Sequence, residues 1–114
     1  MIEGDVTLET VTSPVESGTL YIRIQDVSRA DAESNVVAEA SLSGISLQPG
    51  ENRRLRFSVD VPTMDPRRQY ILTAHLDVSN TGTVTPGDYL TMESIPIDAS
   101  GAIARVSVPA RPVT

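Results

Sequence analysis

The residues best suited to chemistry lie between Asp77 and Asp88, in the stretch DVSNTGTVTPGD. A calcium-binding loop of the EF-hand type places oxygen ligands at its positions 1, 3, 5, 7, 9 and 12, and it needs Gly at position 6 for a sharp turn. Gly82 stands at position 6 here. The ligand positions hold Asp77, Ser79, Thr81, Thr83 (through its backbone carbonyl), Thr85 and Asp88. The spacing therefore predicts a possible calcium site.

The loop has the spacing of a calcium site, but most of its side chains are weak calcium ligands. Only Asp77 and Asp88 carry charge, and Ser and Thr hydroxyls are weak ligands for a hard cation. Because affinity follows the number of charged ligands, we expect a dissociation constant on the order of 10⁻³ M or weaker. The flanking residues resemble strands rather than helices, so the alternative is an ordinary long hairpin whose turns need Gly and Pro.

A second group of candidate residues is basic. Arg54 and Arg56 share the face opposite Leu55 and Phe57, and Arg53 precedes them. The other members of the predicted cluster are Arg67 and Arg68. Guanidinium groups bind carboxylates and phosphates in pairs of hydrogen bonds, so the cluster could hold an anionic group or an acidic partner. The alternative is a solvated face whose charges pair with nearby carboxylates.

No catalytic set emerges from the sequence. His75 is the sole His, there is no Cys, and no Ser is spaced as its partner. Nucleophilic catalysis needs a nucleophile, a base and an orienting acid within reach of one another. The carboxylates of Asp26, Asp31 and Glu33 lie in a polar stretch that is typical of turns and caps. We therefore expect a protein that is not an enzyme.

Composition limits the partners. The chain has 114 residues, 39% apolar and 21% charged, which predicts a single domain over residues 1–114 with a packed core. Its net charge of -6 argues against nucleic acid as the main partner. No stretch is long and apolar enough to span a bilayer, and none reads as a signal peptide. The absence of Cys excludes disulfides and thiolate metal sites.

The elements that position these residues are predicted strands. Side chains alternate between apolar and polar over Leu55–Val61 and Tyr70–Leu76, which is the pattern of strands with one buried face. Asp65 and Pro66 mark the turn between these two strands. Similar alternation predicts further strands over Ile2–Val11, Thr19–Gln25, Val36–Leu42, Tyr89–Ile97 and Ile103–Val108, with turns or loops at 12–18, 26–35 and 43–52. Pro96 places its strand at a sheet edge.

This spacing predicts an all-β fold, an antiparallel β-sandwich or partly open barrel of seven to eight short strands. The strand that begins at Tyr70 follows Asp65-Pro66 at a corner of the predicted sandwich. In sandwiches, a Tyr at such a corner sends its hydroxyl back to the backbone of the preceding connection. We predict that hydrogen bond for Tyr70.

Two segments resemble a known family. Leu20–Leu42 contains Asp26-Val27-Ser28 and Val37-Ala38-Glu39, and Leu55–Leu76 contains Asp65-Pro66-Arg67-Arg68-Gln69-Tyr70. They resemble the bacterial YbaY-like lipoproteins, which are grouped with the YscW-type lipoprotein chaperones, or pilotins, of type III secretion. The resemblance implies a β-sandwich, a periplasmic or cell-envelope location and a lipid anchor on a Cys after a leader. It implies no enzyme activity, and the sequence offers no Cys for the anchor.

The functional hypotheses follow from these observations. The first is a non-catalytic envelope module that binds a protein or peptide, through a partner strand at a sheet edge or a partner helix on an apolar groove. The second is a domain that binds calcium at Asp77–Asp88, or a glycan on the exposed aromatic rings of Tyr21 and Tyr89. A hydrolase is the third.

Overall fold

The computed structural model describes residues 2–8, 11, 14–27, 35–50, 53–61, 67–91, 95–97 and 104–113. These residues form strands and connections, with no helix among them. The strands are β1 (Ile2–Leu8), β2 (Val15–Asp26), β3 (Asn35–Leu47), β4 (Arg53–Val59), β5 (Tyr70–Asp77), β6 (Tyr89–Thr91), β7 (Ile95–Ile97) and β8 (Ala104–Pro112). Accordingly, this part of the chain contains no helix that is long and apolar enough to cross a membrane.

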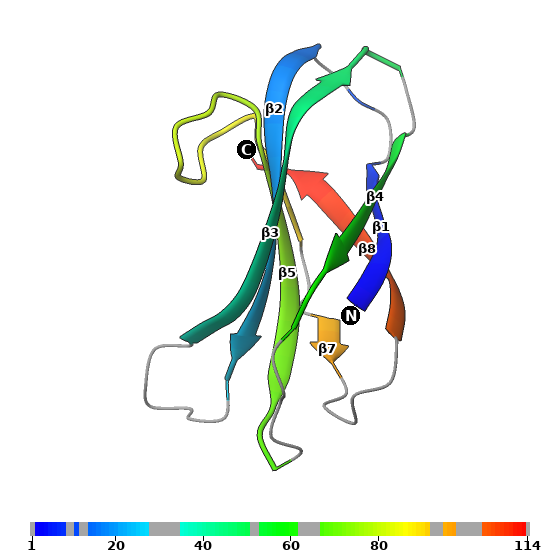
Figure 1. Ribbon diagram of the computed structural model, residues 1–114. Coiled ribbons are helices and arrows are strands. Elements are labelled where there is room, and N and C mark those ends of the chain that lie inside the picture. The colour runs from blue at the N-terminus through cyan, green and yellow to red at the C-terminus, as the bar shows by residue number, and fades with distance from the viewer. Residues whose placement is uncertain are drawn as a thin grey trace.

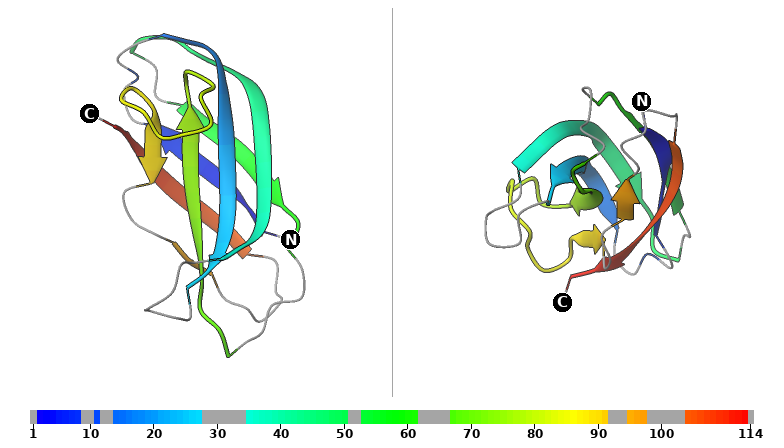
Figure 2. Two further views of the ribbon diagram at one scale, coloured as in Figure 1. Left: turned by 90° about the vertical axis from the view of Figure 1, so that its left-hand side faces the viewer. Right: turned by 90° about the horizontal axis from the view of Figure 1, so that it is seen from below.

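All of these strands belong to one hydrogen-bonded sheet that wraps around a common interior (Figure 2). Its order is β3-β2-β5-β6-β8-β1-β4, and β7 pairs with β5 beside this path. β2, β3 and β5 form one layer, and β1, β4 and β8 form the other, which lies beside it in Figure 1 and runs obliquely behind it in the left view of Figure 2. β3 and β4 are the two ends of the path, so the barrel stays open between them. The prediction of an all-β sandwich or partly open barrel is confirmed.

Two features of the sheet differ from the expected pattern: the direction of one strand pairing and the length of β3. β1 pairs in parallel with β8, from Ile2 with Ala104 to Leu8 with Ala110, whereas the other pairs are antiparallel. β3 continues to Leu47, so the loop predicted over 43–52 is wrong for 43–47. The register between β2 and β3 shifts by one residue near Gly44, whose φ is +73°. Gly44 therefore forms a bulge within the strand instead of ending it.

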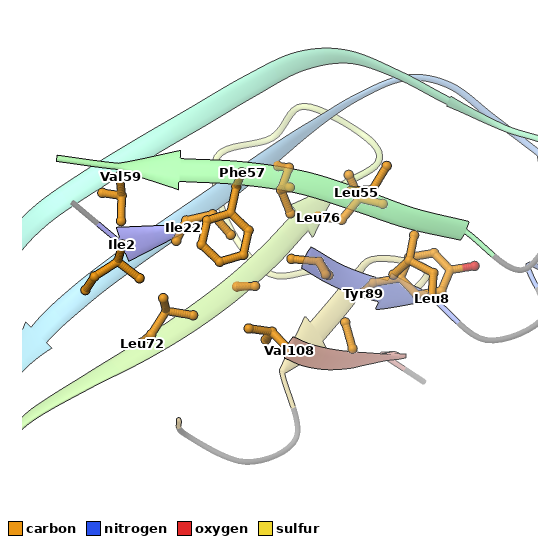
Figure 3. Close-up of a cluster of buried hydrophobic side chains, with 14 of the residues drawn as sticks. Ile2, Leu8, Ile22, Leu55, Phe57, Val59, Leu72, Leu76, Tyr89 and Val108 are labelled. Atoms are coloured by element: carbon orange, nitrogen blue, oxygen red, sulfur yellow. The ribbon is translucent and has the colours of Figure 1, made fainter. Parts of the chain in front are cut away.

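The interior is filled by aliphatic side chains from both layers. Leu55, Phe57 and Val59 point inward from β4, as the alternating pattern predicted, toward Ile22 and Leu72 of the other layer (Figure 3). The other large and fully buried side chains are Val6, Leu8, Val11, Leu20, Ile24, Leu47, Leu76 and Val108. Only Phe57, Tyr70 and Tyr89 add aromatic rings to this core.

Two smaller predictions concern β5 and its neighbours. Pro96 lies in β7, a three-residue strand that pairs only with β5 among the described strands, as its place at a sheet edge predicts. Tyr70 is buried at the start of β5, but the connection to which its hydroxyl was expected to bond includes residues 62–66, which lie outside the described residues. The polar loop predicted over 26–35 lies largely outside them as well.

Candidate functional site

A groove of about 400 Å³ opens between the two edge strands of the sheet. Its apolar lining comes from Leu20 and Ile22 of β2, Ala40 and Leu42 of β3, and Phe57 of β4. Its charged lining comes from Glu3 and Asp5 of β1, Arg56 of β4 and Arg105 of β8. The groove therefore reaches from a charged rim to the side chains of the core.

The groove exists because the inner face of β3 lacks a covering strand. The sequence predicted that Val36, Ala38, Ala40 and Leu42 share one face, and such a face is normally buried. Instead, Leu42 is 42% exposed and Ala38 and Ala40 are only partly buried, while a register shift places Val36 opposite Gln25, so Val36 leaves this face. The side chain of Leu42 thus remains in contact with water at the barrel opening.

Gly4 shapes the inner end of the groove. A Cβ atom on this residue would lie 3.0 Å from Cζ of Phe57 and would collide with the backbone oxygen of Val106. The Phe57 ring and β8 therefore approach β1 more closely than any other residue at position 4 would allow.

The arginines of β4 lie at the rim. Asp5 lies between Arg54 and Arg56, whose Nε atoms are 4.0 and 3.9 Å from its carboxylate oxygens. Their side chains are 71% and 85% exposed, so both guanidinium groups face solvent. Arg105 lies 3.7 Å from Glu3 on the same outer face.

The other two predicted arginines belong to a different part of the fold. Arg68 donates a hydrogen bond of 2.8 Å to Asp26 at the end of β2, and Arg67 is its neighbour before β5. The four arginines are thus divided between β4 and the region where β2 ends and β5 begins. Binding of an anion or acidic partner by them stays a prediction. Of the four, only Arg56 lines the groove, and Arg54 lies beside the same carboxylate, that of Asp5.

The loop that follows β5 is organised by two buried carboxylates. Asp77 accepts hydrogen bonds from the backbone N–H groups of Thr81 and Gly82, at 3.3 and 2.8 Å. Asp88 accepts from the N–H groups of Val78 and Thr85, both at 3.0 Å. The side chains of Asp77 and Asp88 are fully buried, so each carboxylate holds one part of the loop in place.

His75 joins the same cluster from the outer face of β5. Its Nε2 lies 2.8 Å from Oδ2 of Asp88, and its ring stacks on Tyr21 with centroids 6.1 Å apart. Burial acts to raise the pKa of Asp88, but the hydrogen bonds from His75, Thr85 and Val78 together outweigh it, so this pKa lies below its ordinary value. Because an ionised carboxylate only accepts hydrogen bonds, Nε2 of His75 carries the proton in this pair.

The loop residues predicted to bind calcium form two groups in the structure. The carboxylates lie beside His75, and the hydroxyl groups form contacts within the loop. Atoms of His75, Asp77 and Asp88 that could bind a metal lie within 4.8 Å of one another. The hydroxyl groups instead engage each other: Ser79 lies 3.2 Å from Thr85, and Thr81 donates to the carbonyl oxygen of Thr83. Sequence reasoning missed His75 in this cluster, although its place opposite the core face of β5 was correct. Calcium binding stays a prediction.

The residues considered for sugar binding are poorly placed for it. Tyr89 is buried in the core, so the expectation that it exposes a ring is wrong. Tyr21 is partly covered by His75 and by Arg23, whose guanidinium lies 5.1 Å from the ring centre. Asp26 pairs with Arg68, as a structural carboxylate would, and residues 31 and 33 lie outside the described residues.

Comparison with known proteins identifies the family. The sequence profile described as "Type III secretion system lipoprotein chaperone (YscW)" matches residues 1–90, which is more than half of the chain. The chain belongs to the YscW family. The resemblance inferred from Leu20–Leu42 and Leu55–Leu76 to the YscW-type group is thereby confirmed, and both segments lie within the matched residues.

A solved structure agrees with this membership at the level of the fold. It is that of an alternative pilotin from the type II secretion system of Vibrio cholerae, with a TM-score of 0.73 and 21% sequence identity. The alignment covers 99% of this chain and 96% of that one. A search of curated proteins finds no match. The YscW family description points to a chaperone role in secretion, which involves binding another protein.

Proposed function

We propose that this YscW-family protein is a non-catalytic protein-binding module of the bacterial cell envelope. Its partner is a component of a secretion machinery, and the groove between β3 and β4 holds an apolar segment of that partner. The family membership supports the role, and the groove is the observation that carries the site. Partly exposed apolar side chains in a recess are typical of surfaces that bind other proteins.

The chemistry of the groove fits binding rather than catalysis. Its apolar lining can remove a partner's side chains from water, at roughly 25 cal/mol for each Å² of apolar surface buried. The charged groups at its rim are four carboxylate and guanidinium side chains already near one another: Glu3 with Arg105, and Asp5 with Arg56. Such rim charges favour orientation and rate of encounter more than affinity.

Site-specific photo-cross-linking in the native bacterium tests this proposal. A photoreactive phenylalanine analogue replaces Leu42 in the groove, and a matched variant carries it at Ser107, an exposed position on β8 outside the groove lining. We expect Leu42 to cross-link to a component of a secretion system, identified by mass spectrometry, and Ser107 not to do so.

A second substitution makes the assignment specific. Ala40→Arg places a long charged side chain in the groove and should abolish the cross-link from position 42. Equal products from positions 42 and 107, or a cross-link from 42 that persists with Ala40→Arg, would contradict the groove as the binding site.

A further inference from the structure

The two edge strands that border the groove, β3 and β4, differ in how well they are protected against pairing with a further strand. An exposed edge strand offers unpaired backbone N–H and C=O groups to any other strand, and proteins usually block it with Lys, Arg, Pro or a bulge. β4 carries Arg53, Arg54 and Arg56 along its length. β3 has 13 residues but no Pro, no Lys and no Arg. Its single charged residue, Glu39, is bound to Arg23 of β2 at 2.6 Å.

The unprotected part of β3 is also its most regular part. From Ala38 to Leu42, five consecutive residues pair with β2 without a register shift, whereas shifts occur on both sides of this stretch. Within the stretch, Ala40, Ser41 and Leu42 line the groove, and two of these three side chains are small. A second backbone can therefore approach β3 here without meeting a bulky side chain.

We infer that the partner binds as an extended strand that pairs with the free edge of β3 along Ala38–Leu42. This inference rests on the proposed function and specifies how the partner is recognised. Side chains of a strand alternate between its two faces, so every second residue of the partner would point into the groove. These residues must be apolar, because the groove floor consists of Leu20, Ile22 and Phe57.

The opposite edge of the added strand faces β4, and the charges there define a second requirement. Arg54 and Arg56 are mostly exposed, and their Nε atoms stand about 4 Å from Asp5, farther than the 2.7–2.9 Å of a charged hydrogen bond. With Arg105, three guanidinium groups accompany the two carboxylates of Glu3 and Asp5 on this face. This local excess of positive charge contrasts with the net charge of -6 on the chain as a whole. A partner strand with acidic residues between its apolar ones is therefore favoured.

A strand suits this groove better than a helix does. A helix satisfies its own backbone groups internally and would leave the β3 edge in contact with water. A strand uses that edge, and each additional backbone hydrogen bond adds to the affinity of such an interaction. The partner class that follows is an extended segment with alternating apolar and acidic or small polar residues.

A designed peptide tests the inference without any change to the protein. The probe is acetyl-Ser-Val-Glu-Val-Ser-Val-Glu-Val-Ser-amide, titrated into isotope-labelled protein and followed by backbone amide NMR and hydrogen exchange. We expect saturable shifts in Ala38–Leu42 and slower exchange for the outward-facing amides of that stretch. Unchanged β3 amides, with or without shifts in the Leu20 and Ile22 methyl groups, would overturn pairing by a strand.

N-methylated peptides separate backbone pairing from simple apolar contact. Successive N–H groups of a strand point to opposite edges, so methylation of one central Val nitrogen and methylation of the neighbouring Glu or Ser nitrogen block different edges. Only one of the two peptides should lose binding, by about tenfold or more. Equal affinities would overturn the inference, while the cross-linking from Leu42 would still decide the proposed function independently.

A charge exchange tests the acidic preference. Replacement of both Glu residues of the peptide by Lys should weaken binding about tenfold at low salt. Arg56→Gln should remove most of this difference, whereas Arg111→Gln, on β8 outside the groove lining, should preserve it. Equal binding of the Glu and Lys peptides would contradict the role assigned to Arg54 and Arg56.

Discussion

At the scale of single residues, the carboxylate of Asp88 connects three parts of the chain. It accepts hydrogen bonds from His75 on β5 and from Val78 and Thr85 at the two sides of the following loop. Two of these donors are backbone N–H groups of the loop and the third is the ring of His75, and the two oxygens of one carboxylate can accept from all three. The loop depends on an ionised carboxylate at this position.

The lowered pKa of Asp88 has a predictable effect on acid stability. The folded protein holds this carboxylate ionised more strongly than the unfolded chain does, so its contribution to stability is present above about pH 4 and is lost as the pH falls through the folded pKa. Asp88→Asn should reduce the free energy of unfolding at pH 7 by about 2 kcal/mol. It should also flatten the loss of stability below pH 4, as measured by denaturant unfolding across pH.

A matched variant identifies the source of this effect. Asp60→Asn alters an exposed carboxylate after β4 and should leave both the stability at pH 7 and the acid branch close to those of the wild type. An acid branch for Asp88→Asn that follows the wild-type curve would contradict the role of Asp88.

Calcium binding at the same loop is a separate prediction. A calcium ion on Asp77 must compete with the N–H groups of Thr81 and Gly82, which already occupy both carboxylate oxygens. We expect the Gly82 amide to shift in NMR with half-saturation on the order of 10⁻³ M or weaker, and Asp77→Ala to remove the shift. A Gly82 amide that stays unchanged at several times this concentration would identify the loop as a hairpin without a calcium site.

At the scale of the elements, the approach of β8 and Phe57 to β1 depends on Gly4. Gly4→Ala should lower the free energy of unfolding by about 3 kcal/mol or more, because the new Cβ atom collides with the backbone of Val106 and presses on the Phe57 ring. Gly44→Ala is the control: its Cβ meets nothing within 4 Å, and only its positive φ costs about 1 kcal/mol. Equal losses for the two variants would contradict this explanation. Thermal or denaturant unfolding measures both.

The elements also show how far the sequence alone can predict this fold. Alternation located β4 and β5 to within two residues, because their inner faces are apolar and buried, while the outer face of β4 is exposed and that of β5 carries polar or only partly buried side chains. It failed at Ser43–Leu47, where Gly44 marks a bulge rather than a turn, since the same residue type serves both. Alternation also does not encode which strands are neighbours, so neither the parallel β1–β8 pair nor the edge positions of β3 and β4 could be foreseen.

Because local patterns do not encode which strands are neighbours, only part of the candidate site could be predicted. The common face of Arg54 and Arg56 follows from their spacing of two, and the structure places both beside Asp5. Arg67 and Arg68 are close to them in sequence but belong to the connection before β5. The groove arises because no described strand covers Ala40 and Leu42, which depends on the order of strands in the sheet. His75 joined Asp88 because the loop folds back over β5, a path that no local pattern specifies.

At the scale of the whole molecule, β8 holds the two halves of the sheet together. It pairs with β6 on one side and β1 on the other, although it lies beyond the residues matched by the family profile. Without it, β1 and β4 have no hydrogen-bonded connection to β2, β3 and β5 among the described strands. A chain ending at residue 103 should therefore fail to fold, as judged by circular dichroism and by collapse of the amide NMR spectrum. A well-dispersed spectrum from this shortened chain would show that the layers associate without β8.

The parallel alignment of β1 and β8 also determines how the protein resists mechanical load. Ile2 of β1 lies at one end of the ladder and Ala110 of β8 lies at the other end. Tension between these two residues therefore makes the strands slide along each other. Sliding loads the hydrogen bonds of the ladder together, whereas tension between the paired residues Ile2 and Ala104 opens them one after another. Single-molecule extension should therefore require a larger force along the first direction than along the second. The ladder between β1 and β8 thus resists tension along its strands more strongly than tension across them.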